Sequence, residues 1–260
     1  MMSRTYQATG INLQGMAFGE ADRLLTILTA EYGLIRAIAP GARKYKSSLR
    51  GRSELFVVNN LLIVAGKSLD KVVQAETIES YPKLSQNLAK LTVSQYLCEL
   101  VLAIALSEQP QRELYELICS HLARIEVLDE NQYILPYLCQ AIFHFLIIAG
   151  LVPQVHNCLL TGKALIGDNC LGFSFEAGGI IDLAALTETI NPPKIDSKLT
   201  LQELQLLQCL GKPDFPPEEN LTSELAWINL DRLLRRYTQY HLGKTFRSSA
   251  LVEGLSPLEF

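Results

Sequence analysis

Residues 23–39 read RLLTILTAEYGLIRAIA, which is two short apolar runs joined at the step Tyr32-Gly33. Both runs have the length of an ordinary β-strand, and both contain β-branched residues, which favour strands. Glycine supplies the positive φ that a tight turn needs. The two runs are therefore predicted to be antiparallel neighbours in one sheet.

Three more runs of this kind flank the hairpin, and the step Ala65-Gly66-Lys67 predicts a second tight connection. Five antiparallel strands within about 75 residues match an oligonucleotide-binding (OB) barrel, which limits its exposed sheet edges by near closure. An SH3-like barrel is the competing interpretation. The predicted strands are residues 6–13, 23–29, 34–39, 55–64 and 71–78.

After residue 82 the apolar residues recur with helical spacing. This spacing predicts helices at 84–107, 112–128, 132–149, 201–210 and 223–242, with Gly150 as a C-cap and Thr200 as an N-cap. A glycine-rich segment, 156–181, interrupts them and is predicted to form a hairpin. The fold class is therefore α+β. We expect an OB barrel at 1–80 and an all-α helical domain at 81–260, with a hairpin insertion at about 154–182.

The composition is that of a folded globular protein, with 48% hydrophobic and 19% charged residues among 260. No apolar run approaches the roughly 20 residues of a membrane span, and the first residues lack the apolar core of a signal peptide. We therefore expect a cytoplasmic protein without membrane contact. Its six cysteines are scattered, so no disulfides are expected.

The formal net charge of −4 hides an uneven distribution. Residues 4–52 contain eight basic and three acidic residues, giving 8 − 3 = +5, so the rest carries −4 − 5 = −9. The cations are densest in PGARKYKSSLRGR, residues 40–52, which contains five cations and no acid. Such density is typical of a segment that binds a polyanion, although a merely solvated loop is the alternative. The predicted DNA contacts here are Arg36, Arg43, Lys44, Tyr45, Lys46, Ser48, Arg50 and Arg52.

Two aromatic residues in this region offer base stacking in addition to charge. Tyr45 lies within the basic segment, and Phe18 lies in the connection before residue 23. Aromatic side chains on OB surfaces often stack on bases. The alternative for Phe18 is that it plugs the barrel.

A second group of cations follows near the C-terminus, where three arginines at helical spacing are predicted to share one face. An ordinary solvated helix face, with Asp231 and Glu224 as partners, is the alternative. The predicted members of this second basic surface are Arg232, Arg235, Arg236, Lys244 and Arg247.

Four short motifs occur in a distinctive order: GEADR at 19–23, EYG at 31–33, GAR at 41–43 and SSLRG at 47–51. In this order they resemble the N-terminal domain of the RecO family of bacterial recombination and repair mediators, and the similarity extends to LGKTFRS at 242–248. The resemblance implies an OB fold that binds single- and double-stranded DNA and anneals complementary strands. It also implies that the protein joins RecR to load RecA onto DNA coated with single-strand-binding protein (SSB), whose acidic, apolar-ended tail would need a cation-flanked pocket.

Many members of that family carry two Cys-x-x-Cys pairs for zinc in the insertion. Alignment on Gly178-Gly179 places Cys158, Thr161, Asp182 and Ala185 at those positions, so one cysteine remains. His156 and Cys170 would raise the number of ligands to three, whereas structural zinc normally needs four. We therefore expect a degenerate, metal-free insertion and no cofactor. Its predicted packing residues are Leu171, Phe173, Phe175, Ile180 and Ile181.

No group of residues predicts a catalytic site. The triplet GKT at 243–245 echoes the end of a phosphate-binding loop, but Thr238 stands where that motif requires glycine, and a helix precedes it. His121 and His144 lie in helical patterns, where a core or surface role is expected. The leading hypothesis is a DNA-binding mediator that is not an enzyme. The alternatives are a scaffold that mainly binds protein tails, and an enzyme that depends on a metal or a nucleotide.

Overall fold

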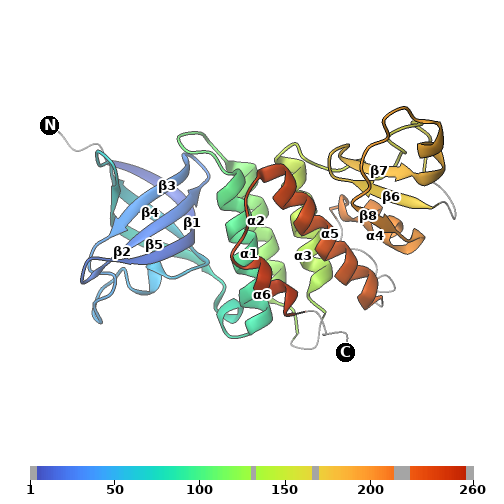
Figure 1. Ribbon diagram of the computed structural model, residues 1–260. Helices are drawn as coiled ribbons and strands as arrows, with labels where there is room; N and C mark the ends of the chain where they lie inside the picture. The colour runs from blue at the N-terminus through green and yellow to red at the C-terminus, as the bar shows by residue number, and fades with distance from the viewer. Residues whose placement is uncertain (1–4, 130–132, 166–169, 214–222, 256–260) are drawn as a thin grey trace. The chain divides into compact units, whose positions relative to one another are not determined.

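The computed structural model describes residues 5–129, 133–165, 170–213 and 223–255 (Figure 1). The chain forms two compact units, Met1–Glu130 and Asn131–Phe260. The predictions that involve Arg4, Gln132 and Gly167 lie outside the described residues. Within the described ranges, no helix combines the length and the hydrophobicity that a membrane span requires.

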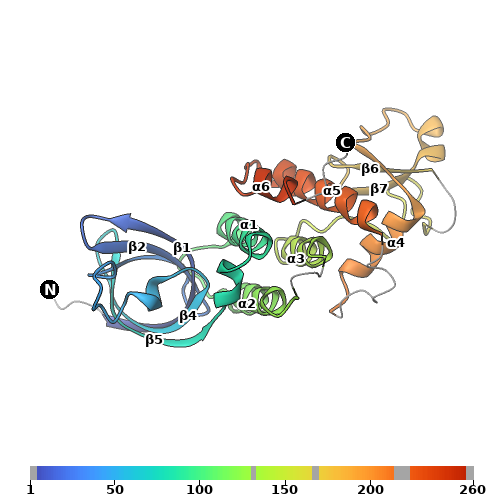
Figure 2. The same cartoon turned by 90° about the horizontal axis from the view of Figure 1, so that it is seen from below.

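Five strands of the first unit close into a barrel in the order β1-β2-β3-β5-β4 (Figure 2). Strand β1 pairs with β4 along its first half and with β2 along its second half, while β3 lies parallel to β5. This order confirms the predicted OB barrel rather than the SH3-like alternative. The strands are β1 (Thr5–Phe18), β2 (Asp22–Thr29), β3 (Gly33–Ala39), β4 (Val57–Val64) and β5 (Asp70–Ser80).

Three predicted strand bounds are wrong by two residues or more. Strand β5 ends at Ser80 rather than at residue 78. Strand β1 continues to Phe18 rather than ending at residue 13, because a bulge between Asn12 and Gln14 restores its pairing with β2. Strand β4 begins at Val57 rather than at residue 55, because Phe56 has a positive φ of 62°. The differences in β1 and β4 depend on pairing and turn geometry rather than on local composition.

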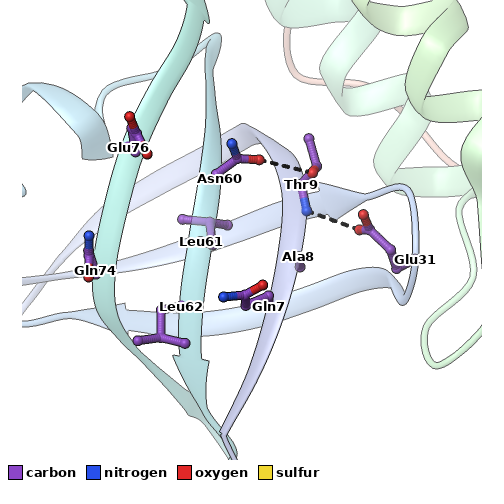
Figure 3. A pocket seen from close by; sticks show the side chains of 9 residues that line it. All are labelled: Gln7, Ala8, Thr9, Glu31, Asn60, Leu61, Leu62, Gln74 and Glu76. Carbon is purple, nitrogen blue, oxygen red and sulfur yellow. Dashed lines mark hydrogen bonds between the residues drawn. The ribbon is translucent and has the colours of Figure 1, made fainter.

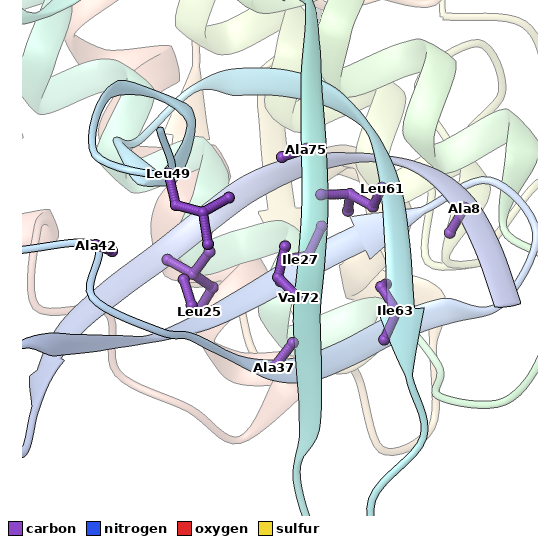
Figure 4. Close-up of a cluster of buried hydrophobic side chains, with 11 residues drawn as sticks. Ala8, Leu25, Ile27, Ala37, Ala42, Leu49, Leu61, Ile63, Val72 and Ala75 are labelled. Atoms are coloured by element: carbon purple, nitrogen blue, oxygen red, sulfur yellow. The ribbon is translucent and has the colours of Figure 1, made fainter. Parts of the chain in front are cut away.

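The barrel interior is a cluster of small and branched apolar side chains that includes Leu25, Ile27 and Ile63 (Figure 4). Two members of the cluster, Ala42 and Leu49, come from the segment between β3 and β4. Figure 4 shows both side chains directed toward the barrel interior. The segment 40–56 therefore packs onto the barrel as a cap.

Two helices complete the first unit, α1 (Leu88–Ile104) and α2 (Arg112–Glu126). The predicted helix at 84–107 is wrong at both ends. Its first turn is the separate 3-10 turn Pro82–Ser85, and α1 begins after Asn87, whose side chain accepts a hydrogen bond from the backbone N–H of Lys90. At the other end, Leu106 O accepts a hydrogen bond of 2.9 Å from Leu34 N, so the chain leaves the helix to pair with the barrel.

Gly33 makes this close approach possible. It has a φ of +67°, and a Cβ at this position would lie 2.1 Å from Leu106 O and 2.6 Å from Gln109 O. The contacts join α1 and α2 to the barrel in one compact unit. The predicted division at residue 80 coincides with the last strand residue of the barrel, and as a domain boundary it stays a prediction.

The second unit contains α3 (Leu135–Ile148), α4 (Leu201–Leu210), α5 (Glu224–Leu242) and the short α6 (Ser249–Glu253). Both predicted caps are confirmed. Gly150 has a φ of +69° and Leu151 N donates to Leu146 O at 2.8 Å, as expected for a helix that ends at a left-handed glycine. The side chain of Thr200 accepts from Glu203 N at 3.2 Å, and the Glu203 carboxylate accepts from Thr200 N at 2.7 Å. Helix α6 was not predicted.

The insertion contains the predicted hairpin, formed by β6 (Leu171–Ser174) and β7 (Gly179–Asp182). A third strand, β8 (Ser197–Leu199), pairs with β6 and extends the sheet beyond the predicted limit at residue 182. The 3-10 segment Leu183–Glu188 lies between β7 and β8 in the chain. The five predicted packing residues of the insertion are all buried.

Candidate nucleic-acid interface

The basic segment is a succession of tight turns. Lys44 N donates to Gly41 O at 2.9 Å, Ser47 N donates to Lys44 O at 3.1 Å, and Arg50 N donates to Ser47 O at 3.2 Å. A 3-10 turn, Gly51–Ser53, follows directly. Such a chain of turns gives each side chain a defined direction from a compact backbone.

The sequence motifs at 19–23 and 41–43 meet at the start of this cap. Asp22 Oδ1 accepts a hydrogen bond of 2.7 Å from Gly41 N, and Ala21 O accepts one of 2.8 Å from Arg43 N. Gly41 has a φ of +62°, a conformation that favours glycine. These bonds fix the first turn of the cap to the β1–β2 connection.

The five cations of the cap divide into two groups. The Arg43 guanidinium donates to Gly19 O at 3.2 Å and Glu20 O at 3.1 Å, and the Arg52 guanidinium donates to Ser48 O at 2.9 Å. The remaining cations, Lys44, Lys46 and Arg50, are exposed. Among the residues that the structure describes, none of the five forms an ion pair. Their charge is therefore available to an external anion.

Two predicted contact residues stand beside these cations, and a third lies on β3. Tyr45 is 84% exposed, and the Arg50 guanidinium carbon lies 5.4 Å from its ring centroid. Ser48 is exposed in the same turn, and Arg36 is exposed on β3. Phe18 is 40% exposed at the end of β1, so it does not plug the barrel.

The second basic surface is only partly as predicted. Arg232 and Arg236 are exposed on α5, but Arg235 is 2% exposed. The Arg235 guanidinium donates to both carboxylate oxygens of Asp231, with Nε–Oδ1 at 2.9 Å and Nη2–Oδ2 at 2.8 Å, and to Ser249 Oγ at 2.7 Å. The prediction that Arg235 contacts DNA is therefore wrong.

Helix geometry gives the reason for this error. Positions 232 and 236 are four apart and lie nearly in line, whereas position 235 is turned about 60° from 232, toward the side that packs. The buried residues Asp231, Leu234 and Thr238 lie on that side. Lys244 and Arg247 are exposed beyond the helix, which ends at Gly243 with a φ of +60°.

Arg232 and Arg236 line a cavity of about 310 Å³ between β8 and α5. Lys198 of β8 adds a third cation, and Leu199 and Leu233 are apolar residues in the same lining. Lys198 was missed in the sequence because a strand of three residues leaves too little alternation to detect. The lining also includes Glu203, whose carboxylate is already occupied by hydrogen bonds from Thr200 N (2.7 Å) and Asn229 Nδ2 (2.8 Å).

A larger hollow of about 420 Å³ lies on strands β1, β4 and β5 of the barrel (Figure 3). Its lining includes Glu31 and Glu76 together with amide side chains, and it includes no Lys or Arg. The Glu31 carboxylate accepts a hydrogen bond of 3.0 Å from Thr9 N, and Thr9 Oγ1 lies 3.1 Å from Asn60 Oδ1. The charge of this hollow is unsuited to phosphate.

The four positions at which the resemblance would place zinc ligands, Cys158, Thr161, Asp182 and Ala185, line one cavity of about 250 Å³ in the insertion. Burial opposes ionisation of Cys158, but hydrogen bonds from the backbone of Asp182 and from Thr161 outweigh it and lower the pKa of Cys158. One thiol does not fit structural zinc, which requires four ligands. Within the described ranges, no three His, Cys, Asp or Glu side chains gather closely enough to hold a metal ion.

Two known protein families match nearly the whole chain. The family described as "Recombination protein O N terminal" matches residues 2–81, and "Recombination protein O C terminal" matches residues 85–250. A DNA repair protein RecO from Gloeothece citriformis is 54% identical over the full length of both chains. Proteins of the same name are 47% identical in a Nostoc species, over 97% of this chain and 96% of the relative, and 49% identical in Trichodesmium erythraeum, over 99% and 98%.

Proposed function

The chain belongs to the RecO family of DNA repair and recombination proteins, and on that premise we propose that it is a recombination mediator that binds single- and double-stranded DNA. The observation that supports this most directly is the cap on the barrel, from which Lys44, Lys46 and Arg50 project without an acidic partner among the described residues. Contacts from lysine and arginine to phosphate oxygens leave the base edges free. Two complementary strands held in this way can pair, so the protein promotes annealing without covalent chemistry.

The exposed cations of the second unit extend this proposal. Arg232, Arg236, Lys244 and Arg247 offer a second surface for a DNA backbone. Tyr45, which is part of the cap, stacks on an unpaired base. With RecR as its partner, the protein loads RecA onto DNA coated with SSB, as the family relationship leads us to propose.

The test uses two variants of equal net charge. One replaces Lys44, Lys46 and Arg50 of the cap with serine. The control replaces three exposed lysines elsewhere in the same unit with serine: Lys67, Lys71 and Lys83. Affinity for single-stranded DNA and the rate of strand annealing are measured across a salt series, with and without SSB.

Five phosphate contacts on a single strand give a slope of log K against log salt of about −3.5, at about −0.7 for each contact. Loss of three contacts should flatten the slope to about −1.4 and slow annealing, while the control keeps the parent slope. The same slope in both variants and in the parent protein would refute the cap as the DNA-binding surface.

A second candidate function is supported by the groove between β8 and α5. An acidic, apolar-ended tail such as that of SSB can place its carboxylates against Lys198, Arg232 and Arg236 and its apolar end against Leu199 and Leu233. Replacing Arg232 and Arg236 with serine should then abolish binding of a tail peptide, and the triple cap variant should bind it normally. If the groove variant instead loses DNA affinity and keeps the peptide, the groove serves DNA.

A further inference from the structure

Two asparagines are fully buried in the wall of the barrel, directly beneath the end of the cap. Asn12 of β1 and Asn59 of β4 are both 0% exposed. Burying an amide costs free energy unless hydrogen bonds replace those to water. The bonds that these two amides make therefore indicate what they do.

Both amides hold the same stretch of cap backbone. Asn12 Nδ2 donates to Arg52 O and to Glu54 O, at 2.8 Å each, and Asn59 Nδ2 donates to Arg52 O at 2.9 Å. The carbonyl of Arg52 thus accepts two hydrogen bonds from two different strands. A hydroxyl group sets the orientation of the second amide, because Thr77 Oγ1 lies 3.1 Å from Asn59 Oδ1.

Each asparagine lies at an irregularity in its strand. The register of β1 shifts between Asn12 and Gln14, and the register of β4 against β5 shifts between Val58 and Asn59. A bulge can redirect a side chain that regular alternation would place elsewhere. Both strands therefore depart from regular pairing at the residue that reaches the cap.

We propose that Asn12 and Asn59 are positioning residues for DNA binding, which fix the backbone at Arg52 so that Arg50 and Arg52 face the phosphates together with the cap lysines. This inference rests on the proposed function of the cap. Neither amide touches DNA, since both are fully buried. They act by removing the conformational freedom that these arginines would otherwise lose on binding.

The first experiment needs no DNA and compares two neighbouring asparagines of β4. Asn59→Leu removes a donor to Arg52 O, while Asn60→Leu changes an exposed residue whose side chain bonds only to Thr9 among the described residues. Limited trypsin digestion with mass analysis reports release of the cap, because trypsin cleaves after its lysines and arginines. We expect nicking within residues 43–52 to rise about tenfold in Asn59→Leu and to stay at the parent rate in Asn60→Leu.

The second experiment measures single-stranded DNA affinity across the same salt series. In Asn59→Leu, loss of the phosphate contacts of Arg50 and Arg52 should flatten the slope of log K against log salt by about 1.4, at about 0.7 for each contact. Thr77→Val, which leaves Asn59 in place but removes the hydroxyl beside it, should shift nicking and slope in the same direction by a smaller amount. If Asn59→Leu does not fold, Thr77→Val takes its place as the test of the positioning role.

Unchanged nicking and slope in a folded Asn59→Leu protein, or in Thr77→Val where Asn59→Leu does not fold, would overturn the proposal. Raised nicking with an unchanged slope would also overturn it, because the amides would then hold the cap without serving DNA. A failure of the cap's proposed function looks different: the triple cap variant would bind DNA like the parent protein, whatever the trypsin result.

Discussion

Arg235→Met tests whether the buried arginine of α5 stabilises the second unit. The substitution leaves the carboxylate of Asp231 at 0% exposure without its bidentate partner and removes a donor to Ser249. Removing one member of a buried ion pair costs about 3–5 kcal/mol, because the other charge stays desolvated. That is a large share of the roughly 5–15 kcal/mol that stabilises a domain, and it lowers the melting temperature by on the order of 10–20 °C.

The assay is urea unfolding followed by the fluorescence of Trp227, the single tryptophan of the chain, which is buried in the same helix. The matched control is the neighbouring Arg236→Met, whose side chain is exposed and lies 5.3 Å from the Phe175 ring centroid, so that its loss should change the unfolding free energy by at most about 1 kcal/mol. The double variant Asp231→Leu with Arg235→Met should regain most of the lost stability, since it leaves no buried unpaired charge; Glu253, the other carboxylate beside Arg235, is exposed to water. The reasoning fails if Arg235→Met costs less than about 1 kcal/mol, or if Arg236→Met costs as much.

Three further predictions concern other parts of the chain. Gly33→Ala should destabilise the first unit by at least about 2 kcal/mol in urea unfolding, because its Cβ would meet Leu106 O at 2.1 Å; Gly19→Ala, with φ +59° and open space, should cost only about 1 kcal/mol. Burial opposes ionisation of Asp196, but hydrogen bonds and cations outweigh it and lower the pKa of this carboxyl group in the folded state. The ionised carboxylate therefore stabilises the fold at pH values above its unfolded-state pKa of about 4, and this contribution fades as the pH falls further. Unfolding of Asp196→Asn should therefore differ from the parent at pH 7, with a gap that narrows below pH 4; a constant gap would contradict this. Cysteines introduced into the insertion beside Cys158 should give a tetrahedral site whose cobalt complex has thiolate absorption, and an unchanged spectrum would show that the cavity is the wrong shape. The introduced changes are Thr161→Cys, Asp182→Cys and Ala185→Cys.

The barrel could be predicted from sequence because its signals are local. Apolar runs of strand length and the glycine at position 33 need no knowledge of the rest of the chain. The errors arise where a distant contact decides. Strand β1 passes the polar Gln14 because β2 pairs with it, and α1 ends before residue 107 because the turn at Gly33 takes the carbonyl of Leu106.

The basic segment could also be recognised from sequence, since charge density is a property of composition. The packing of this segment onto the barrel could not be predicted, because the many cations around Ala42 and Leu49 give it the composition of an exposed loop. Helical spacing placed Arg235 beside Arg232 and Arg236, but spacing alone does not tell which flank of a narrow stripe is buried. The two asparagines gave no sequence signal, because an Asn within a strand pattern points inward or outward according to the bulge beside it.

The packed cap bears on how a chain of net charge −4 would bind DNA in the proposed manner. An unstructured basic arm would lose conformational entropy on binding, and that loss would offset part of the attraction to phosphate. Here Ala42 and Leu49 are buried in the barrel core, and Asp22 accepts a hydrogen bond from the first turn, so much of that ordering is already present in the free protein. The cations then act from fixed positions, and the acidic remainder of the chain matters less, since charges more than about 10 Å apart are largely screened at 0.1 M salt. If the cap binds DNA as proposed, the apolar and amide side chains beneath it contribute to DNA affinity together with the lysines and arginines above it.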